Sequence, residues 1–193
     1  MERNRLEAFS DGVLAIVITI TVLELKAPVS TGLSDLIGLI PSILVYAMSF
    51  IYVGAYWNNH HHIMQAVTYV NTRTMWSNLF FLFWISLLPL ATTWMSSDLM
   101  AWVPTLAYGI VLLMTAIGYS LLQKSIIKND KNNEVLKKAV EDGRARTDIS
   151  AMLYILALIL SPFAVHVSQF IYVFLLMIWF VPERRIAHII HHN

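Results

Sequence analysis

Long runs of apolar residues, separated by short polar segments, make up most of this chain. The first run, FSDGVLAIVITITVLEL, starts at Phe9 and has no charged residue between Asp11 and Glu24. Each run is near the roughly 20 residues that a helix needs to cross the hydrocarbon layer of a bilayer. The pattern therefore predicts an all-α membrane protein with six transmembrane helices, over residues of about 8–25, 34–57, 75–96, 101–123, 149–164 and 168–181.

Prolines and polar stretches indicate where these helices bend or end. Pro41 falls in the first two turns of the second helix, where a missing amide costs little. Pro89 lies inside the third helix and predicts a kink there. The one long polar connection, about 124–148, contains an amphipathic stretch at 135–140 that predicts a short separate helix.

Composition supports the membrane assignment and excludes several classes of protein. Of the 193 residues, 58% are hydrophobic and 13% are charged, whereas soluble domains have about 45–50% apolar and about 25% charged residues. The net charge of +1 suggests no nucleic-acid partner. The absence of cysteine excludes disulfides and thiol catalysis. No Walker loop, dinucleotide glycine motif or G-x-S-x-G sequence is present, which argues against an ATP-driven pump.

Lysine and arginine are distributed unequally between the two predicted sides of the membrane. One side carries only Lys26, and the other carries twelve: Arg3, Arg5, Arg73, Lys124, Lys128, Lys131, Lys137, Lys138, Arg144, Arg146, Arg184 and Arg185. Cytoplasmic loops are the positive ones. The bias predicts that both termini are cytoplasmic, which requires an even number of spans. With six spans and no large extramembrane segment, residues 1–193 are expected to form one multi-pass domain in the cell membrane.

The first helix carries a stripe of residues at helical spacing. Gly12, Ile16, Ile20 and Leu23 fall on one face, with Thr19 beside them. If several copies of this helix surrounded an axis, rings of these side chains would form a hydrophobic constriction of an ion pore. On periodicity alone, an ordinary packed helix face remains the alternative.

Charged and titratable residues next to this stripe are further candidates. Asp11 lies six residues from Arg5, so the two are not simple helix neighbours, and a partner for Asp11 is expected on another helix or subunit, unless the acid stays hydrated at the interface. His60 and His61, with His62, are consecutive and point about 100° apart, so hydrogen bonding to the first helix is favoured over metal binding. His188, His191 and His192 have a spacing that permits metal binding or pH sensing.

The motif at the start of the first helix resembles a known family. The residues Arg5-x-x-x-Phe9-Ser10-Asp11-Gly12 match the R-x-x-x-F-S-D-G hallmark of the prokaryotic branch of the transmembrane protein 175 family, the lysosomal and endosomal potassium channels. The end of the second helix, Tyr56-Trp57-Asn58-Asn59-His60-His61, is similar to the family's F-W-x-x-H-H, with Tyr56 in place of phenylalanine. Asn78 and the stretch from Leu87 to Thr92 also resemble family patterns.

This resemblance implies a potassium-preferring cation channel that lacks a carbonyl-type filter, permits passive permeation and uses no cofactor. It implies a homotetramer in the bilayer, with the first helix lining the pore, Ile16 at the constriction, and Thr19, Ile20 and Leu23 on the pore side. It also implies that a polar network holds this helix in place, with Asp11 architectural. The implied members are Arg5, Phe9, Ser10, Asp11, Gly12, Trp57, His60, His61 and Asn78.

Two rival functions belong to other classes. A proton-coupled secondary transporter would use Asp11 and the histidines of the second helix as a relay, and would move substrate uphill with a fixed proton stoichiometry. A membrane enzyme would use the histidines with a metal ion, and chelators would abolish its activity. The chain is expected not to be an enzyme, because no convincing set of metal ligands is present.

Overall fold

Seven helices and no strand make up the part of the chain that the computed structural model describes. That part comprises residues 2–28, 30, 32–65, 67, 69–129 and 134–180, with backbone only for residues 134–146 and 180. The all-helical prediction is confirmed. The helices are α1 (Arg3–Leu23), α2 (Leu33–Gln65), α3 (Thr72–Ile85), α4 (Leu88–Ser97), α5 (Trp102–Asn129), α6 (Glu134–Leu160) and α7 (Val165–Phe180).

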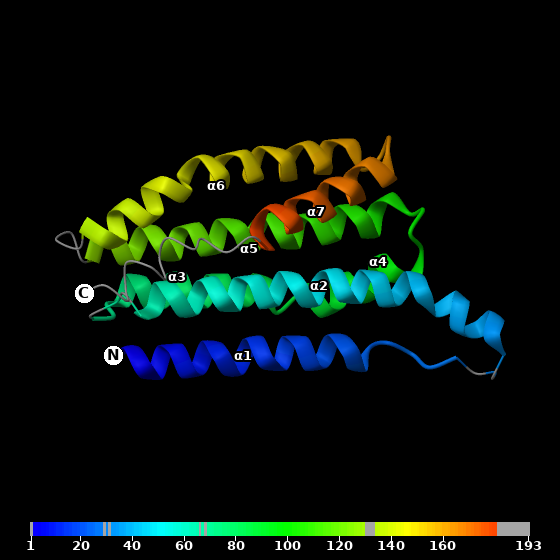
Figure 1. Cartoon of the computed structure of the whole chain (residues 1–193), viewed down its shortest axis with the longest axis horizontal. Coiled ribbons are helices and arrows are strands. Elements are labelled where there is room, and N and C mark those ends of the chain that lie inside the picture. Colours follow the sequence, from blue (N-terminus) through cyan, green and yellow to red (C-terminus); the bar gives the residue numbers. More distant parts are fainter. Residues whose placement is uncertain are drawn as a thin grey trace.

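The helices lie side by side along one long axis (Figure 1). Helix α1 lies along one edge of the bundle and contacts α2, α3 and α4. Helix α6 lies along the opposite edge and packs on α5 and α7. The chain starts at the N-terminal end of the bundle, while the α1–α2, α4–α5 and α6–α7 connections lie at the other end, which we call the far end.

In the described part of the chain, four spans are long and apolar enough to cross a membrane: Arg3–Leu23, Leu33–Gln65, Thr72–Ser97 and Trp102–Asn129. Two shorter apolar helices, Thr147–Leu160 and Val165–Trp179, follow within the described residues. Six apolar helical segments thus correspond in position to the six that the sequence pattern predicts.

The third span is broken rather than merely kinked. Helix α3 ends at Ile85 and α4 begins at Leu88, with Pro89 in the first turn of α4. Proline lacks an amide donor, and its ring clashes with the carbonyl of the residue four positions earlier. That residue is Ile85, so the helix stops there and restarts where proline is tolerated.

Three helices extend past the ends of their predicted apolar runs. Helix α2 runs on through the polar stretch after Trp57 to Gln65. Helices α5 and α6 extend into the predicted polar connection, so the stretch at 135–140 belongs to the start of α6 and is not a separate helix. A helix satisfies its backbone hydrogen bonds in lipid and in water alike, so the end of an apolar run marks membrane depth and not the end of the helix.

Buried hydroxyl groups in the described residues have hydrogen-bond partners. Tyr52 Oη donates to the carbonyl of Tyr172 at 2.6 Å, and Ser49 Oγ lies 3.0 Å from Tyr108 Oη. Smaller hydroxyls bond back to their own helix, as Thr115 Oγ1 does to Val111 O at 2.7 Å. Such pairing is expected where no water competes, because an unpaired polar group in a low-dielectric interior is costly.

Candidate functional site

One face of α1 is left open by its own chain. The predicted stripe lies in the middle of this face: Phe9 is 51% exposed, Ile16 58%, Ile20 42% and Leu23 75%, and Arg5, Gly12 and Thr19 are also exposed. We call this surface the open face of α1. Between Arg5 at one end and Leu23 at the other it carries no charged side chain, so it is apolar apart from the hydroxyl of Thr19.

The opposite face of α1 is buried against the rest of the chain. Its buried residues are Leu6, Ser10, Leu14, Val17 and Thr21. The hydroxyls of Ser10 and Thr21 donate to the carbonyls of Leu6 and Val17, at 2.8 and 2.6 Å. Because the burial of this face fixes the rotation of α1, it also fixes which residues the open face presents.

A buried polar chain joins α1 to α2 through α3. Asn78 Nδ2 on α3 donates to Ser10 Oγ at 2.9 Å, and Asn78 Oδ1 lies 2.9 Å from His60 Nε2 on α2. All three side chains have no exposed surface. A carboxamide oxygen only accepts, so His60 Nε2 carries the proton and donates. His60 Nδ1 is then left as a buried acceptor with no partner among the described residues.

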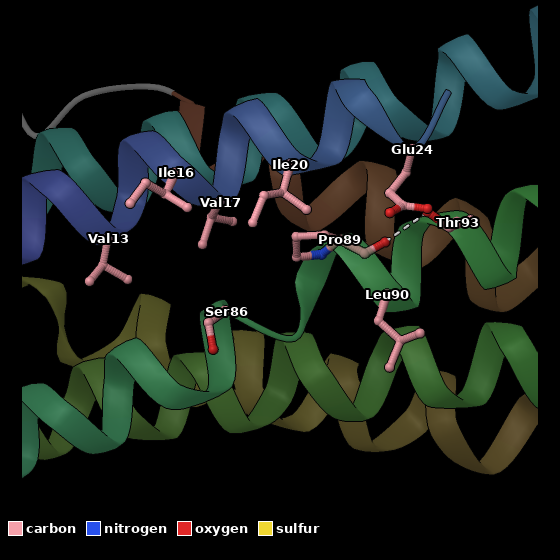
Figure 2. Close-up of a pocket in the computed structure, with 9 residues that line it drawn as sticks. All are labelled: Val13, Ile16, Val17, Ile20, Glu24, Ser86, Pro89, Leu90 and Thr93. Carbon is pink, nitrogen blue, oxygen red and sulfur yellow. Dashed lines mark hydrogen bonds between the residues drawn. The ribbon is translucent and has the colours of Figure 1, made fainter. Parts of the chain in front are cut away.

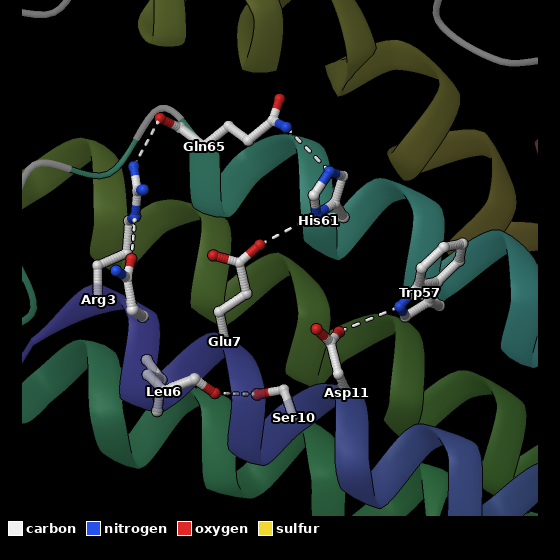
Figure 3. A network of polar contacts seen from close by, with 9 residues as sticks. Arg3, Leu6, Glu7, Ser10, Asp11, Trp57, His61 and Gln65 are labelled. Atoms are coloured by element: carbon white, nitrogen blue, oxygen red, sulfur yellow. Dashed lines mark hydrogen bonds and ion pairs between the residues drawn. The ribbon is translucent and has the colours of Figure 1, made fainter.

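A second set of contacts joins α1 directly to α2 (Figure 3). Trp57 Nε1 donates to Asp11 Oδ1 at 3.0 Å, and His61 Nδ1 lies 3.0 Å from Glu7 Oε1. Gln65 Nε2 extends the set to His61 Nε2 at 2.9 Å. Glu7 and Asp11 are four residues apart on α1, as Trp57 and His61 are on α2, so the two antiparallel helices are joined one turn apart.

The charged residues at the start of α1 are placed differently from what the sequence suggested. Arg5 is exposed, and no hydrogen bond or ion pair of its side chain is found within the described residues. Arg3 is the arginine that bonds to α2, with Nη1 3.3 Å from the carbonyl of Gln65. Glu7 was not among the predicted network residues. The sequence did contain a clue to this contact, because Glu7 and Asp11 are four residues apart, as Trp57 and His61 are.

The hydroxyl proton of Thr19 is engaged in a hydrogen bond within α1. Thr19 Oγ1 donates to the carbonyl of Ala15 at 2.9 Å, and the side chain is exposed. Once the proton is committed to the backbone, the oxygen's lone pairs point away from the helix as acceptors. An exposed oxygen of this kind can interact with a cation but cannot easily donate to an anion.

A cavity of about 400 Å³ lies beside the open face, between α1 and the α3–α4 break (Figure 2). Its residues from α1 include Ile16 and Ile20 of the stripe, and it ends at Glu24, the residue that caps α1. The other wall comes from Ser86, Pro89, Leu90 and Thr93. Its lining contains one charged side chain, that of Glu24.

The histidines do not assemble a metal site in the described part of the chain, where no three potential ligands converge. His188, His191 and His192 lie outside the described residues. Within them, His60 and His61 bond to Asn78 and Glu7, which belong to neighbouring helices.

The fold and this site define an all-helical, multi-pass membrane protein with one apolar helix face left open by its own chain. The sequence profile of the family described as endosomal/lysosomal potassium channel TMEM175 matches residues 5–89, which contain the stripe and both sets of polar contacts. A potassium channel of Chryseobacterium sp. (strain P1-3) is 44% identical over 193 residues, 100% of both chains. The chain therefore belongs to the TMEM175 family, and the resemblance inferred from its motifs is confirmed.

Other relatives agree with this assignment. A potassium channel of Streptomyces collinus (strain DSM 40733 / Tue 365) is 33% identical over 129 residues, 63% of each chain. A crystal structure described as a lysosomal potassium-selective channel TMEM175 homologue, from Chamaesiphon minutus, superposes with a TM-score of 0.78 at 28% identity. That match covers 92% of this chain and 96% of the other.

Proposed function

We propose that this protein is a potassium-preferring cation channel, a homotetramer whose pore is lined by the open face of α1. The observation that carries the proposal is the division of α1 into two faces. One face is fixed to α2 and α3 by polar contacts, and the other is uncovered and, apart from the hydroxyl of Thr19, apolar along the span. Family membership and the names of the relatives support a potassium channel over an enzyme or a pump.

The proposed pore follows from the residues on the open face. Ile16 forms the narrowest ring, with Ile20 and Leu23 as further apolar rings toward the far end. A constriction of this kind controls permeation because water and ions enter an apolar ring only when it is wide enough to stay wet. The Thr19 oxygen replaces part of the hydration shell of a passing ion, and potassium gives up its shell more readily than sodium.

The proposed orientation places the N-terminal end of the bundle in the cytoplasm of a bacterial cell. In the described residues this end carries Arg3, Arg5, Arg73, Lys124 and Lys128, whereas the far end carries only Lys26. The positive-inside rule then makes the far end the outer end. The polar contacts of Glu7, Asp11, Trp57 and His61 lie near the cytoplasmic end, and the cavity at Glu24 near the outer end.

The test compares potassium and sodium flux in liposomes that contain wild type or Ile16→Asn. We expect passive, potassium-preferring flux in the wild type. We expect the substitution to change the rate or the selectivity by about tenfold, because a polar ring wets and widens the constriction. Thr19→Ala in the same assay is expected to lower the preference for potassium.

Ile159→Asn is the matched control, because Ile159 is 60% exposed, like Ile16, but belongs to α6. If Ile16→Asn and Ile159→Asn changed the flux equally, or if Ile16→Asn did not change it, the proposal that α1 lines the pore would be wrong. If potassium moved only with a proton gradient and against its own, the rival transporter reading with Asp11 and His60 or His61 would replace the channel.

A further inference from the structure

The far end of the bundle carries more negative than positive charge. Its charged residues are Glu24, Lys26, Asp35 and Asp98, which is three carboxylates against one ammonium, or −2 per chain. Four copies would therefore place a net negative charge around the outer end of the proposed pore. A negative field attracts cations before they enter a channel.

Two of these three carboxylates have local structural roles. Asp35 Oδ2 accepts from the amide of Gly32 at 3.1 Å, and Asp98 Oδ1 accepts from the amide of Met100 at 2.8 Å. Both therefore stabilise the turns in which they lie. The carboxylate of Glu24 makes no hydrogen bond or ion pair with the described residues, and Lys26 does not pair with it there. Glu24 is thus the outer carboxylate without a structural task in the described chain.

Glu24 is also the outer carboxylate nearest to the open face. It directly follows Leu23, the last residue of the stripe, and caps the C-terminus of α1. Its side chain lines the same cavity as Ile16 and Ile20 (Figure 2). Neighbouring packed helices lie about 8–10 Å apart, so where four α1 helices surround an axis, each helix lies roughly 6–7 Å from it and each Glu24 within about 10 Å of it. That distance is about one Debye length at 0.1 M salt.

We propose that Glu24 determines the rate of permeation, by concentrating potassium ions at the outer mouth of the pore. The inference rests on the function proposed above and assigns a role to a residue beyond the α1 stripe. The effect is electrostatic, so it acts on any monovalent cation and leaves the choice between potassium and sodium to the constriction. It also depends on salt, because the Debye length shrinks from about 30 Å at 0.01 M to about 3 Å at 1 M.

Single-channel conductance in planar bilayers tests this role, with wild type, Glu24→Gln and Glu24→Asp at about 10 mM and about 1 M KCl. Glutamine keeps the size of the side chain and removes its charge. We expect Glu24→Gln to lower the conductance about threefold to tenfold at 10 mM and to match wild type at 1 M, where the field is screened. Glu24→Asp should stay close to wild type at both concentrations, and Glu24→Gln should keep the wild-type ratio of potassium to sodium permeability.

Asp98→Asn is the matched control, because asparagine keeps the oxygen that accepts from Met100 while it removes a charge at the same end. Its effect at 10 mM should be smaller than that of Glu24→Gln. Equal conductance of Glu24→Gln and wild type at 10 mM would overturn the proposal, and so would an equal loss at both salt concentrations, which marks a structural defect. Wild type without passive potassium current would overturn the proposed function and this inference with it. If wild type conducts potassium passively and Glu24→Gln has the same conductance at about 10 mM KCl, only the inference about Glu24 would be overturned.

Discussion

At the scale of single residues, the contacts of α1 show which polar groups the fold requires. Ser10, Asn78 and His60 form one chain of buried hydrogen bonds, and Asn78 is its centre, since it donates to Ser10 and accepts from His60. Asp11 and Glu7 form separate contacts with Trp57 and His61. Removing one member of a buried network leaves its partners unsatisfied, so the central residue should matter most.

Replacing Asn78 with alanine tests this point. The substitution leaves Ser10 Oγ without its inter-helix donor and removes the acceptor of His60 Nε2. We expect the free energy of unfolding, measured with SDS in mixed micelles, to fall by about 1–3 kcal/mol. Ser97→Ala is the control, because Ser97 is exposed and bonds only to its own helix, and it should change the free energy by less than about 0.5 kcal/mol.

The double variant Ser10→Ala/Asn78→Ala should cost less than the two single variants added together, since both remove the same bond. Strict additivity would show that the two side chains do not interact in the membrane.

At the scale of elements, the close contact between α3 and α5 depends on a glycine, which has no side chain. A Cβ atom built on Gly118 of α5 would lie 2.8 Å from the Cα of Phe81 on α3. Backbone atoms cannot turn aside as side chains do, so α3 and α5 could meet at this distance only because position 118 is glycine. The contact holds α3 against α5, and α3 carries Asn78 to its place between Ser10 and His60.

Gly118→Ala is expected to push α3 and α5 apart and to lower the free energy of unfolding by about 1–3 kcal/mol, as overpacking does. Gly54→Ala on α2 is the matched control, because nothing lies within 4 Å of the Cβ position there. The same SDS unfolding measurement should find Gly54→Ala neutral or slightly stabilised. A stable Gly118→Ala protein would mean that the two helices separate at little cost.

At the scale of the whole molecule, the main feature is a helix face that the chain does not cover. Gly12 lies within this face and has nothing within 4 Å of its Cβ position, so a larger side chain fits the single chain without conflict. In the proposed tetramer the same position faces the other copies of α1. A large residue at Gly12 should therefore weaken the assembly without destabilising the single chain.

Gly12→Leu is expected to leave the helix content of the detergent-solubilised protein unchanged and to shift the particle mass, measured by light scattering, from four chains toward one. Gly38→Leu is the control, since Gly38 is also exposed and open but lies near the start of α2, at the far end of the bundle. A Gly12→Leu protein that remains tetrameric and conducts normally would show that the α1 helices do not meet closely at this level.

Apolar runs, proline positions and one short motif determined much of this protein from sequence alone. Segment lengths predicted helices of membrane length, because the bilayer admits few alternatives to a helix. The motif from Arg5 to Gly12 identified the family, and helical spacing alone placed Gly12, Ile16 and Ile20 on one face. These are local properties, since they depend on residues within a few turns of one another.

Only the tertiary structure decided which polar residues meet. The contacts of Glu7 with His61, and of Asn78 with both Ser10 and His60, depend on the rotation and depth of three separate helices. Hydropathy also did not show that α2 continues to Gln65, because a helix keeps its own hydrogen bonds after it leaves the bilayer. Packing likewise decided the arginines: Arg5, despite its place in the motif, makes no hydrogen bond or ion pair within the described residues, while Arg3 bonds to the end of α2. Spacing within one helix follows from sequence, whereas partners between helices are selected by packing.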